Sequence, residues 1–216
     1  MLDELHVYAK SEPLSAAMNM AVDEALFEAA VAPTLRFYGW RQPSLSFGYF
    51  GRYSDAVSEG REMVRRWTAG GIVLHGADLT YSFILPRGHM AATRSSRAVY
   101  SFVHGAIEKA LSATGRVELA AADAPKVSDA CFANAVVADV LIDGRKIAGA
   151  AQRRTRAGLL HQGSIQYAAL PIDFPEAFAA TLCRRVKPRS FSPELLERAS
   201  RIAAEKYATS EWLRRR

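Results

Sequence analysis

The chain has little cysteine. Its 216 residues include only Cys131 and Cys183, which lie far apart without a Cys-x-x-Cys spacing, and this argues against a disulfide framework and a zinc knuckle. Long apolar runs are also missing, since no stretch approaches the roughly 20 residues of a transmembrane helix. Residues 1–6 have neither the basic start nor the apolar segment of a signal peptide. We therefore expect reduced thiols, no membrane association and a cytoplasmic location.

Internal repeats, low-complexity tracts and linkers rich in proline, glycine or serine are absent from the sequence. Without such a boundary, we expect a single domain over residues 1–216, with a helical segment from about residue 192. Half of the residues are hydrophobic and a tenth are aromatic, which is enough for a core that needs no metal or disulfide. We therefore expect no metal site.

The formal net charge is +6, but the basic residues are spread through the chain and their densest cluster is at residues 214–216. A spread charge is weak evidence for a nucleic-acid groove. A basic surface would favour the approach of an acidic protein partner equally well. Charge alone does not choose between these partners, and we predict no nucleic-acid partner.

Hydrophobic spacing and turn residues predict three helices and several strands. The spacing of 3.6 residues predicts helices over residues 14–30, 96–113 and 193–207. Aromatic and β-branched runs between turn residues predict strands over residues 35–40, 45–50, 64–67, 72–75, 79–85, 136–142, 146–153 and 158–167. The last three strands are divided by good turn chemistry and predict an antiparallel meander. The order indicates an α+β fold with a mixed, largely antiparallel sheet and segregated helices.

A glycine pair and a lysine within this pattern are candidates for a functional site. Gly70 and Gly71 would let the backbone approach a ligand and expose amide hydrogens to a carbonyl or phosphate oxygen; the alternative is an ordinary hairpin turn. Lys146 lies in an apolar strand pattern, where a buried ammonium group needs an anionic or strongly dipolar partner. Such a lysine would stabilise the oxyanion that forms in acyl transfer, and the alternative is a lysine that points to solvent.

One cysteine and two histidines are further candidates, each with a structural alternative. Cys131 is either a nucleophile or an inert buried thiol. His75 and His161 either transfer protons, because histidine titrates near neutrality, or serve as hydrogen-bonded structural residues. The residue types alone do not decide these roles, so the motifs around them matter.

Four segments carry a family resemblance together. They are residues 19–26 (NMAVDEAL), residues 65–75 (RRWTAGGIVLH) with 79–82 (LTYS), residues 143–152 (DGRKIAGAAQ) and residues 160–165 (LHQGSI). In this order and approximate spacing they resemble the superfamily of lipoate-protein ligases, octanoyltransferases and biotin-protein ligases. The resemblance covers residues 14–167 and implies a class II biotin/lipoate ligase-like fold.

The position of Cys131 is similar to that in one branch of this superfamily. Cys131-Phe132 precedes Lys146 at the spacing seen in octanoyltransferases that work through a cysteine thioester, and the Arg-Asn-Asp pattern of the ATP-dependent ligases is absent here. The resemblance therefore implies that Cys131 and Lys146 are catalytic. It also implies a set of substrate-binding residues: Arg65, Thr68, Gly70, Gly71, His75, Tyr81, Gly149, His161 and Gly163.

The implied activity is transfer of an octanoyl or lipoyl group from acyl carrier protein to a lysine of a lipoyl domain, in 2-oxoacid dehydrogenases or in the glycine cleavage H protein. This reaction would need no cofactor. An ATP-dependent lipoate-protein ligase, which would bind ATP and Mg²⁺, is the alternative. A non-catalytic binder of lipoyl domains or of an acyl cofactor is a further alternative, although the presence of both Cys131 and Lys146 speaks against it.

Overall fold

The computed structural model describes residues 1–9, 12–56, 58–125, 132 and 134–215. The predicted nucleophile Cys131 lies outside the described residues. In the described part of the chain, one sheet has eight strands in the order β11-β1-β2-β6-β10-β9-β8-β7 and a smaller sheet has the order β4-β3-β5. No helix described here is both long and apolar enough to cross a membrane.

The large sheet is antiparallel except at one edge. The strands are β1 (Leu5–Tyr8), β2 (Thr34–Tyr38), β6 (Leu79–Pro86), β7 (Val117–Leu119), β8 (Val140–Ile142), β9 (Arg145–Thr155), β10 (Gly158–Ile165) and β11 (Val186–Pro188). Strand β1 pairs in parallel with both β11 and β2, whereas β2, β6, β10, β9, β8 and β7 pair in antiparallel fashion. The small sheet contains β3 (Ser44–Phe47), β4 (Glu62–Arg65) and β5 (Val73–His75).

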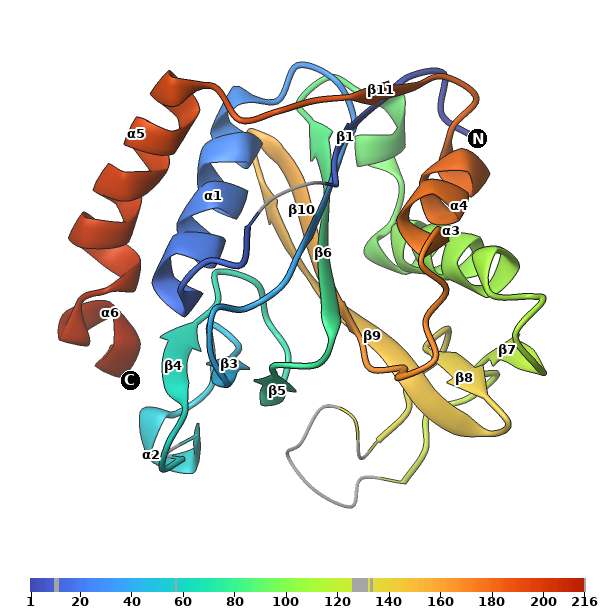
Figure 1. Ribbon diagram of the computed structural model, residues 1–216, viewed down its shortest axis with the longest axis horizontal. Coiled ribbons are helices and arrows are strands. Elements are labelled where there is room, and N and C mark those ends of the chain that lie inside the picture. Colours follow the sequence, from blue (N-terminus) through green and yellow to red (C-terminus); the bar gives the residue numbers. More distant parts are fainter. Residues whose placement is uncertain (10–11, 57, 126–131, 133, 216) are drawn as a thin grey trace.

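Helices cover both faces of the large sheet (Figure 1). On one side lie α1 (Ala16–Ala29), α5 (Pro193–Ile202) and α6 (Ser210–Arg214), with a π-helical turn at Ala203–Tyr207; on the other lie α3 (Ser96–Ala110) and α4 (Phe174–Leu182). Two short helical pieces, α2 (Tyr53–Ala56) and a 3-10 turn (Met90–Thr93), lie in connections. Ser15 caps α1 by accepting from the amide of Met18, and Ser95 caps α3 by accepting from the amide of Ala98.

The core has two layers, one on each face of the large sheet. Successive strand residues point to opposite faces: Leu159 packs in the cluster with α3 and α4, whereas Leu160 packs in the cluster with α1 and α5. Phe83 and Ile84 on β6 divide in the same way. Both faces are therefore buried, which explains the consecutive apolar residues at 83–85 on β6 and 159–160 on β10.

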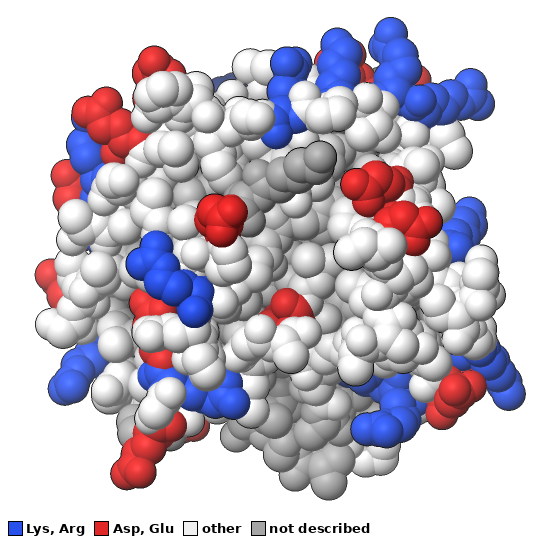
Figure 2. Space-filling model, in the orientation of Figure 1, with Lys and Arg blue, Asp and Glu red and all other residues white. Residues whose placement is uncertain are grey.

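Charged side chains are distributed around the molecule. Figure 2 shows Lys and Arg around the rim of one face, with a group along the upper edge, where β11 lies in Figure 1. The exposed basic residues of that segment are Arg184, Arg185, Lys187 and Arg189. Lys187 pairs with Glu4 at 2.8 Å.

The predicted α+β class with a largely antiparallel sheet is confirmed. Each predicted helix and strand has a counterpart at its position, and β8, β9 and β10 form the predicted meander. The strands predicted over residues 35–40 and 45–50 belong to different sheets, because β3 pairs with β4 and β5 instead of β2. The sequence pattern does not reveal β1, β7, β11, α4 or α6, most of which are short and depend on partners distant in sequence.

Candidate functional site

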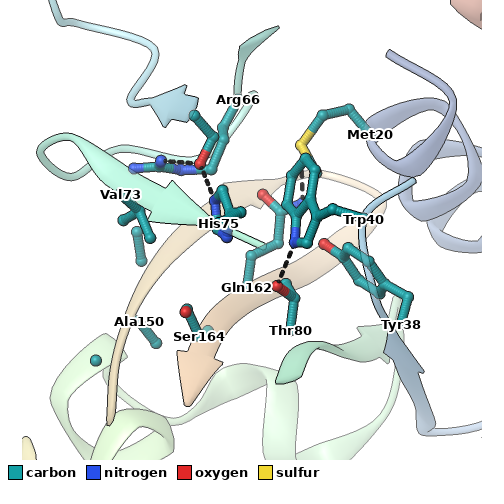
Figure 3. A pocket seen from close by; sticks show the side chains of 14 residues that line it. Met20, Tyr38, Trp40, Arg66, Val73, His75, Thr80, Ala150, Gln162 and Ser164 are labelled. Carbon is teal, nitrogen blue, oxygen red and sulfur yellow. Dashed lines mark hydrogen bonds between the residues drawn. The ribbon is translucent and has the colours of Figure 1, made fainter. Parts of the chain in front are cut away.

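A pocket lies between the two sheets, at the N-terminal half of α1. Across the three central strands, Ser164 on β10 pairs with Thr80 on β6 and with Gly149 on β9, so these three residues share one face of the sheet. Figure 3 shows the side chains that converge on the pocket. Its lining consists of Met20, Tyr38, Trp40, Ser46, Arg66, Val73, His75, Thr80, Gly149, Ala150, Ala151, Gln162, Gly163 and Ser164. Three of the predicted residues, His75, Gly149 and Gly163, are thus brought together here.

His75 forms one wall of the pocket. Its Nδ1 lies 2.8 Å from Asp78 Oδ2 and its Nε2 lies 2.6 Å from Ser46 Oγ, while the Trp40 ring stacks on it at 3.9 Å. Burial lowers the pKa of His75 below its usual value, against the effect of Asp78. The imidazole is therefore neutral at pH 7, with Nδ1 donating to the carboxylate and Nε2 accepting from the Ser46 hydroxyl.

Asp78 organises the polar end of this wall. Its Oδ2 also accepts hydrogen bonds from Thr80 Oγ1 at 2.8 Å and from Ser164 Oγ at 2.7 Å. Burial alone would raise the pKa of Asp78, but the bonds from His75, Ser164 and Thr80 lower it below the usual value. Asp78 thus holds three pocket residues in place as an ionised acceptor.

The glycine loop is shaped by Arg66, whose side chain donates to the carbonyls of Ala69 (3.2 Å) and Gly71 (2.8 Å) and to Ser46 Oγ (2.6 Å). Gly70 has a φ of 94°, a conformation that favours glycine. Gly70 and Gly71 line a separate hollow with Phe47 and Gly48. The predicted loop glycines therefore lie outside the pocket lining, and the pocket residue Arg66 bonds to their loop.

Thr68 and Arg65, two further predicted residues of this motif, form hydrogen bonds to neighbouring elements. Thr68 is buried and donates from Oγ1 to Gln162 Oε1 at 2.8 Å, so it orients a pocket residue. Arg65 is fully buried and donates to the backbone carbonyls of Tyr49, Gly51 and Leu213. The bonds that the structure shows for Arg65 tie β4 to the C-terminal helix α6, and Arg66 is the motif arginine that lines the pocket.

Tyr81 and His161 lie on the opposite face of the sheet from the pocket, in a buried chain of hydrogen bonds. His104 Nδ1 lies 2.7 Å from the Ala138 carbonyl and must donate to it, so His104 Nε2 accepts from the Tyr81 hydroxyl at 3.2 Å. Tyr81 in turn accepts from His161 Nε2 at 3.1 Å, and His161 Nδ1 accepts from Gln152 at 3.1 Å. Burial and then His104 hold the pKa of His161 well below its usual value.

We expect His104 to make the folded protein less stable as the pH falls. Burial lowers the pKa of His104 to about 4, whereas the pKa of histidine in an unfolded chain is about 6.5. Between these values the unfolded state binds more protons, so the free energy of unfolding decreases from about pH 6.5 to about pH 4, by about 3 kcal/mol at most. Urea denaturation at several pH values should show a flatter dependence for His104→Asn; an unchanged slope would contradict this assignment.

The side chain of Lys146 is buried and forms an ion pair with Asp139. The two side chains are 6% and 0% exposed, and Lys146 Nζ lies 2.7 Å from Asp139 Oδ2. Opposite β9, Leu141 faces Lys146 but Val140 faces Ala148, so the pairing shifts by one residue. Bulges of this kind redirect side chains, and here the shift lets Lys146 lie across Gly149.

Gly149 leaves the space that the lysine occupies. A Cβ atom at residue 149 would lie 2.8 Å from Lys146 Cε and 2.9 Å from its Nζ. Since Gly149 lines the pocket, the ammonium group lies at the pocket's border. The dipolar or anionic partner that the sequence requires for a buried lysine is therefore Asp139, which the sequence alone does not single out.

The residues that flank the predicted nucleophile approach Lys146. Its Nζ donates to the carbonyl of Asn134 at 3.1 Å and lies 5.4 Å from the centre of the Phe132 ring. Cys131 itself is outside the described residues, and its catalytic role stays a prediction. Among the described residues, Phe132 and Asn134 lie close to the ammonium group.

Comparisons with a family model and with known relatives agree on one family. Residues 15–191 match the family model described as the lipoyl protein ligase A/B catalytic domain. The chain is 34% identical over 218 residues to octanoyltransferase LipM of Oceanobacillus iheyensis, with 94% of this chain and 78% of the relative covered. It is 30% identical over 272 residues to octanoyltransferase LipM of Brevibacillus brevis, with 97% and 98% covered.

Solved structures share the fold at lower sequence identity. A lipoate-protein ligase A bound with ATP has a TM-score of 0.75 at 18% identity, with 99% of this chain and 98% of that chain covered. A bi-partite lipoate protein ligase from Thermoplasma acidophilum has a TM-score of 0.72 at 21% identity, with 98% and 96% covered. At these identities the likeness establishes the architecture.

Proposed function

This chain belongs to the lipoyl protein ligase A/B catalytic domain family, and we propose that it is an octanoyltransferase that acts through a thioester on Cys131. The donor is octanoyl-acyl carrier protein and the acceptor is a lysine of a lipoyl domain. Relatives named octanoyltransferase LipM support this activity, since they align over most of the chain. The observation that carries the mechanism is the buried Lys146 ammonium group at the pocket's border, beside the residues that flank Cys131.

In the first half-reaction, the Cys131 thiolate attacks the carbonyl carbon of the octanoyl thioester. A new carbon–sulfur bond forms, the donor's carbon–sulfur bond breaks, and the carrier leaves as a thiolate that takes up a proton. Negative charge develops on the carbonyl oxygen during the attack. The Lys146 ammonium group stabilises that charge by hydrogen bonding and favours the thiolate form of the nucleophile.

In the second half-reaction, the neutral amine of the lipoyl-domain lysine attacks the acyl-enzyme. The amide bond forms, the Cys131 thiolate leaves, and the amine loses a proton. Lys146 stabilises the oxyanion of this step as well, because both attacks occur at the same carbonyl. No step consumes ATP, so this route requires neither ATP nor Mg²⁺.

The pocket supplies an apolar place for the acyl chain. Met20, Trp40 and Val73 present apolar surface from α1, the segment after β2 and β5, and Figure 3 shows them around the same space. The backbone of β9 at Gly149 and Ala150 forms the side nearest to Lys146. The chain's carbonyl would lie at this side, with the hydrocarbon among the apolar side chains.

The test is octanoyl transfer by the purified protein without ATP. The protein is incubated with octanoyl-acyl carrier protein and a lipoyl domain, and intact-mass spectrometry follows both the enzyme and the domain. We expect a transient octanoyl adduct on the enzyme and a stable one on the domain. Modification that requires free octanoate or lipoate together with ATP and Mg²⁺ would instead identify a ligase, and binding without modification would identify a non-catalytic binder.

A further inference from the structure

Asp139 is the centre of a buried cluster beside the catalytic lysine. Its carboxylate is fully buried and lies 2.7 Å from Lys146 Nζ. The same oxygen, Oδ2, accepts from the backbone amide of Val136 at 2.8 Å, and the other oxygen, Oδ1, accepts from the Tyr100 hydroxyl. A buried carboxylate needs such partners, and this one has donors at both oxygens.

Tyr100 connects this cluster to the strand that borders the pocket. While its hydroxyl donates to Asp139, its oxygen accepts from the backbone amide of Ala150 at 3.1 Å. Burial and then the charge of Asp139 raise the pKa of Tyr100, so the hydroxyl stays protonated and remains a donor. Asp139 is thus linked to β9 at two points, through Lys146 and through Tyr100 to Ala150.

Hydrogen bonds also fix the backbone at Asp139. Ala138 has a φ of 69°, which is unusual for a residue other than glycine. Its carbonyl accepts from His104 at 2.7 Å, at the end of the chain of hydrogen bonds through Tyr81 and His161. The Asp139 carbonyl accepts from the Ala120 amide at 2.8 Å. This framework keeps the carboxylate in one place.

We propose that Asp139 is a positioning residue for the transfer reaction: it holds the Lys146 ammonium group over Gly149, where the acyl carbonyl binds. The inference rests on the proposed function. A lysine has a flexible four-carbon stem, so its charge is useful to a transition state only if a partner restrains it. Asp139 supplies that restraint and compensates the buried positive charge.

The test compares substitutions at Asp139 in two backgrounds. We expect Asp139→Asn to lower kcat about 10- to 100-fold with little change in KM, because the ammonium group loses its restraint. Asp139→Glu keeps the charge and should recover part of the loss. In a Lys146→Gln background, Asp139→Asn should change kcat by less than about twofold, since residues that act as a unit are not additive. Asp143→Asn, in the exposed β8–β9 turn, is the matched control.

Folding is followed separately, because Asp139→Asn leaves a buried ammonium group without its carboxylate. Thermal unfolding should show a loss in Asp139→Asn that the Asp139→Asn/Lys146→Gln double variant largely restores. Two results would overturn the proposal. One is a wild-type kcat in Asp139→Asn, and the other is a loss of kcat in the double variant that equals the product of the losses in the two single variants.

An observation without turnover separates this inference from the proposed function. The side-chain ¹⁵N signal of Lys146, identified by its absence in Lys146→Gln, should be resolved in the wild type and broadened in Asp139→Asn. If the wild type transfers no acyl group, the proposed function fails while this signal still reports the restraint. A signal that Asp139→Asn leaves unchanged overturns the positioning role whatever the activity.

Discussion

Replacing Cys131 with alanine is expected to eliminate the octanoyl adduct on the enzyme and to lower transfer about 10⁴-fold or more. A covalent route divides acyl transfer into two attacks, and without the nucleophile neither attack takes place. Losses of this size are found when the nucleophile of a covalent enzyme is removed. Intact-mass spectrometry after mixing with octanoyl-acyl carrier protein measures the adduct, and the rate of lipoyl-domain modification measures turnover.

The matched control is the second cysteine of the chain. Cys183 is buried at the end of α4, where its sulfur lies 3.3 Å from the Arg185 amide. Cys183→Ala should therefore keep both the adduct and the rate, with a modest effect on stability. An octanoyl adduct that persists in Cys131→Ala, or a rate that is unchanged by it, would refute the thioester route.

Replacing Lys146 with methionine is expected to lower kcat for octanoyl transfer about 10²- to 10³-fold. The ammonium group lies beside Phe132 and Asn134, which are close in sequence to the predicted nucleophile, and removal of one oxyanion-stabilising donor has effects of this order. Both half-reactions should become slow, because each passes through an oxyanion at the same position. Rapid quenching followed by intact-mass spectrometry measures the formation and the decay of the acyl-enzyme separately.

A second ion-paired lysine offers a control for the loss of a partly buried charge. Lys206 lies 2.6 Å from Glu24 Oε2, in the π-helical turn that packs against α1. Lys206→Met removes a lysine–carboxylate pair away from the pocket lining, so it should affect stability without slowing the chemical steps. If Lys146→Met slows neither half-reaction, or slows transfer no more than Lys206→Met does, Lys146 has no role in the chemistry.

Much of the architecture could be predicted because it depends on local patterns. The helix over residues 14–30 and the meander over residues 136–167 have clear periodicity and turn residues, and both are present. By contrast, β11 has three exposed residues and forms only because β1, from the other end of the chain, pairs with it. No local pattern reports a pairing across so many residues.

The residues of the candidate site also differ in whether the sequence could predict them. His75, Gly149 and Gly163 could be assigned from the motifs and do line the pocket. Arg66 and Asp139 could not be assigned in advance, because their roles depend on what surrounds them. Two adjacent arginines look equivalent in sequence, yet β4 directs Arg65 to the carbonyls of α6 and the next residue, Arg66, to the glycine loop.

The sequence by itself determined the family, the class of fold and the pairing of a cysteine with a lysine as catalytic candidates, because these follow from residue types at characteristic spacings. Only the tertiary structure decided which charge compensates Lys146, since Asp139 meets it through the shifted pairing of β8 with β9 and the space above Gly149. A buried charge is stable only with partners in fixed positions, and those positions exist only once the chain has folded.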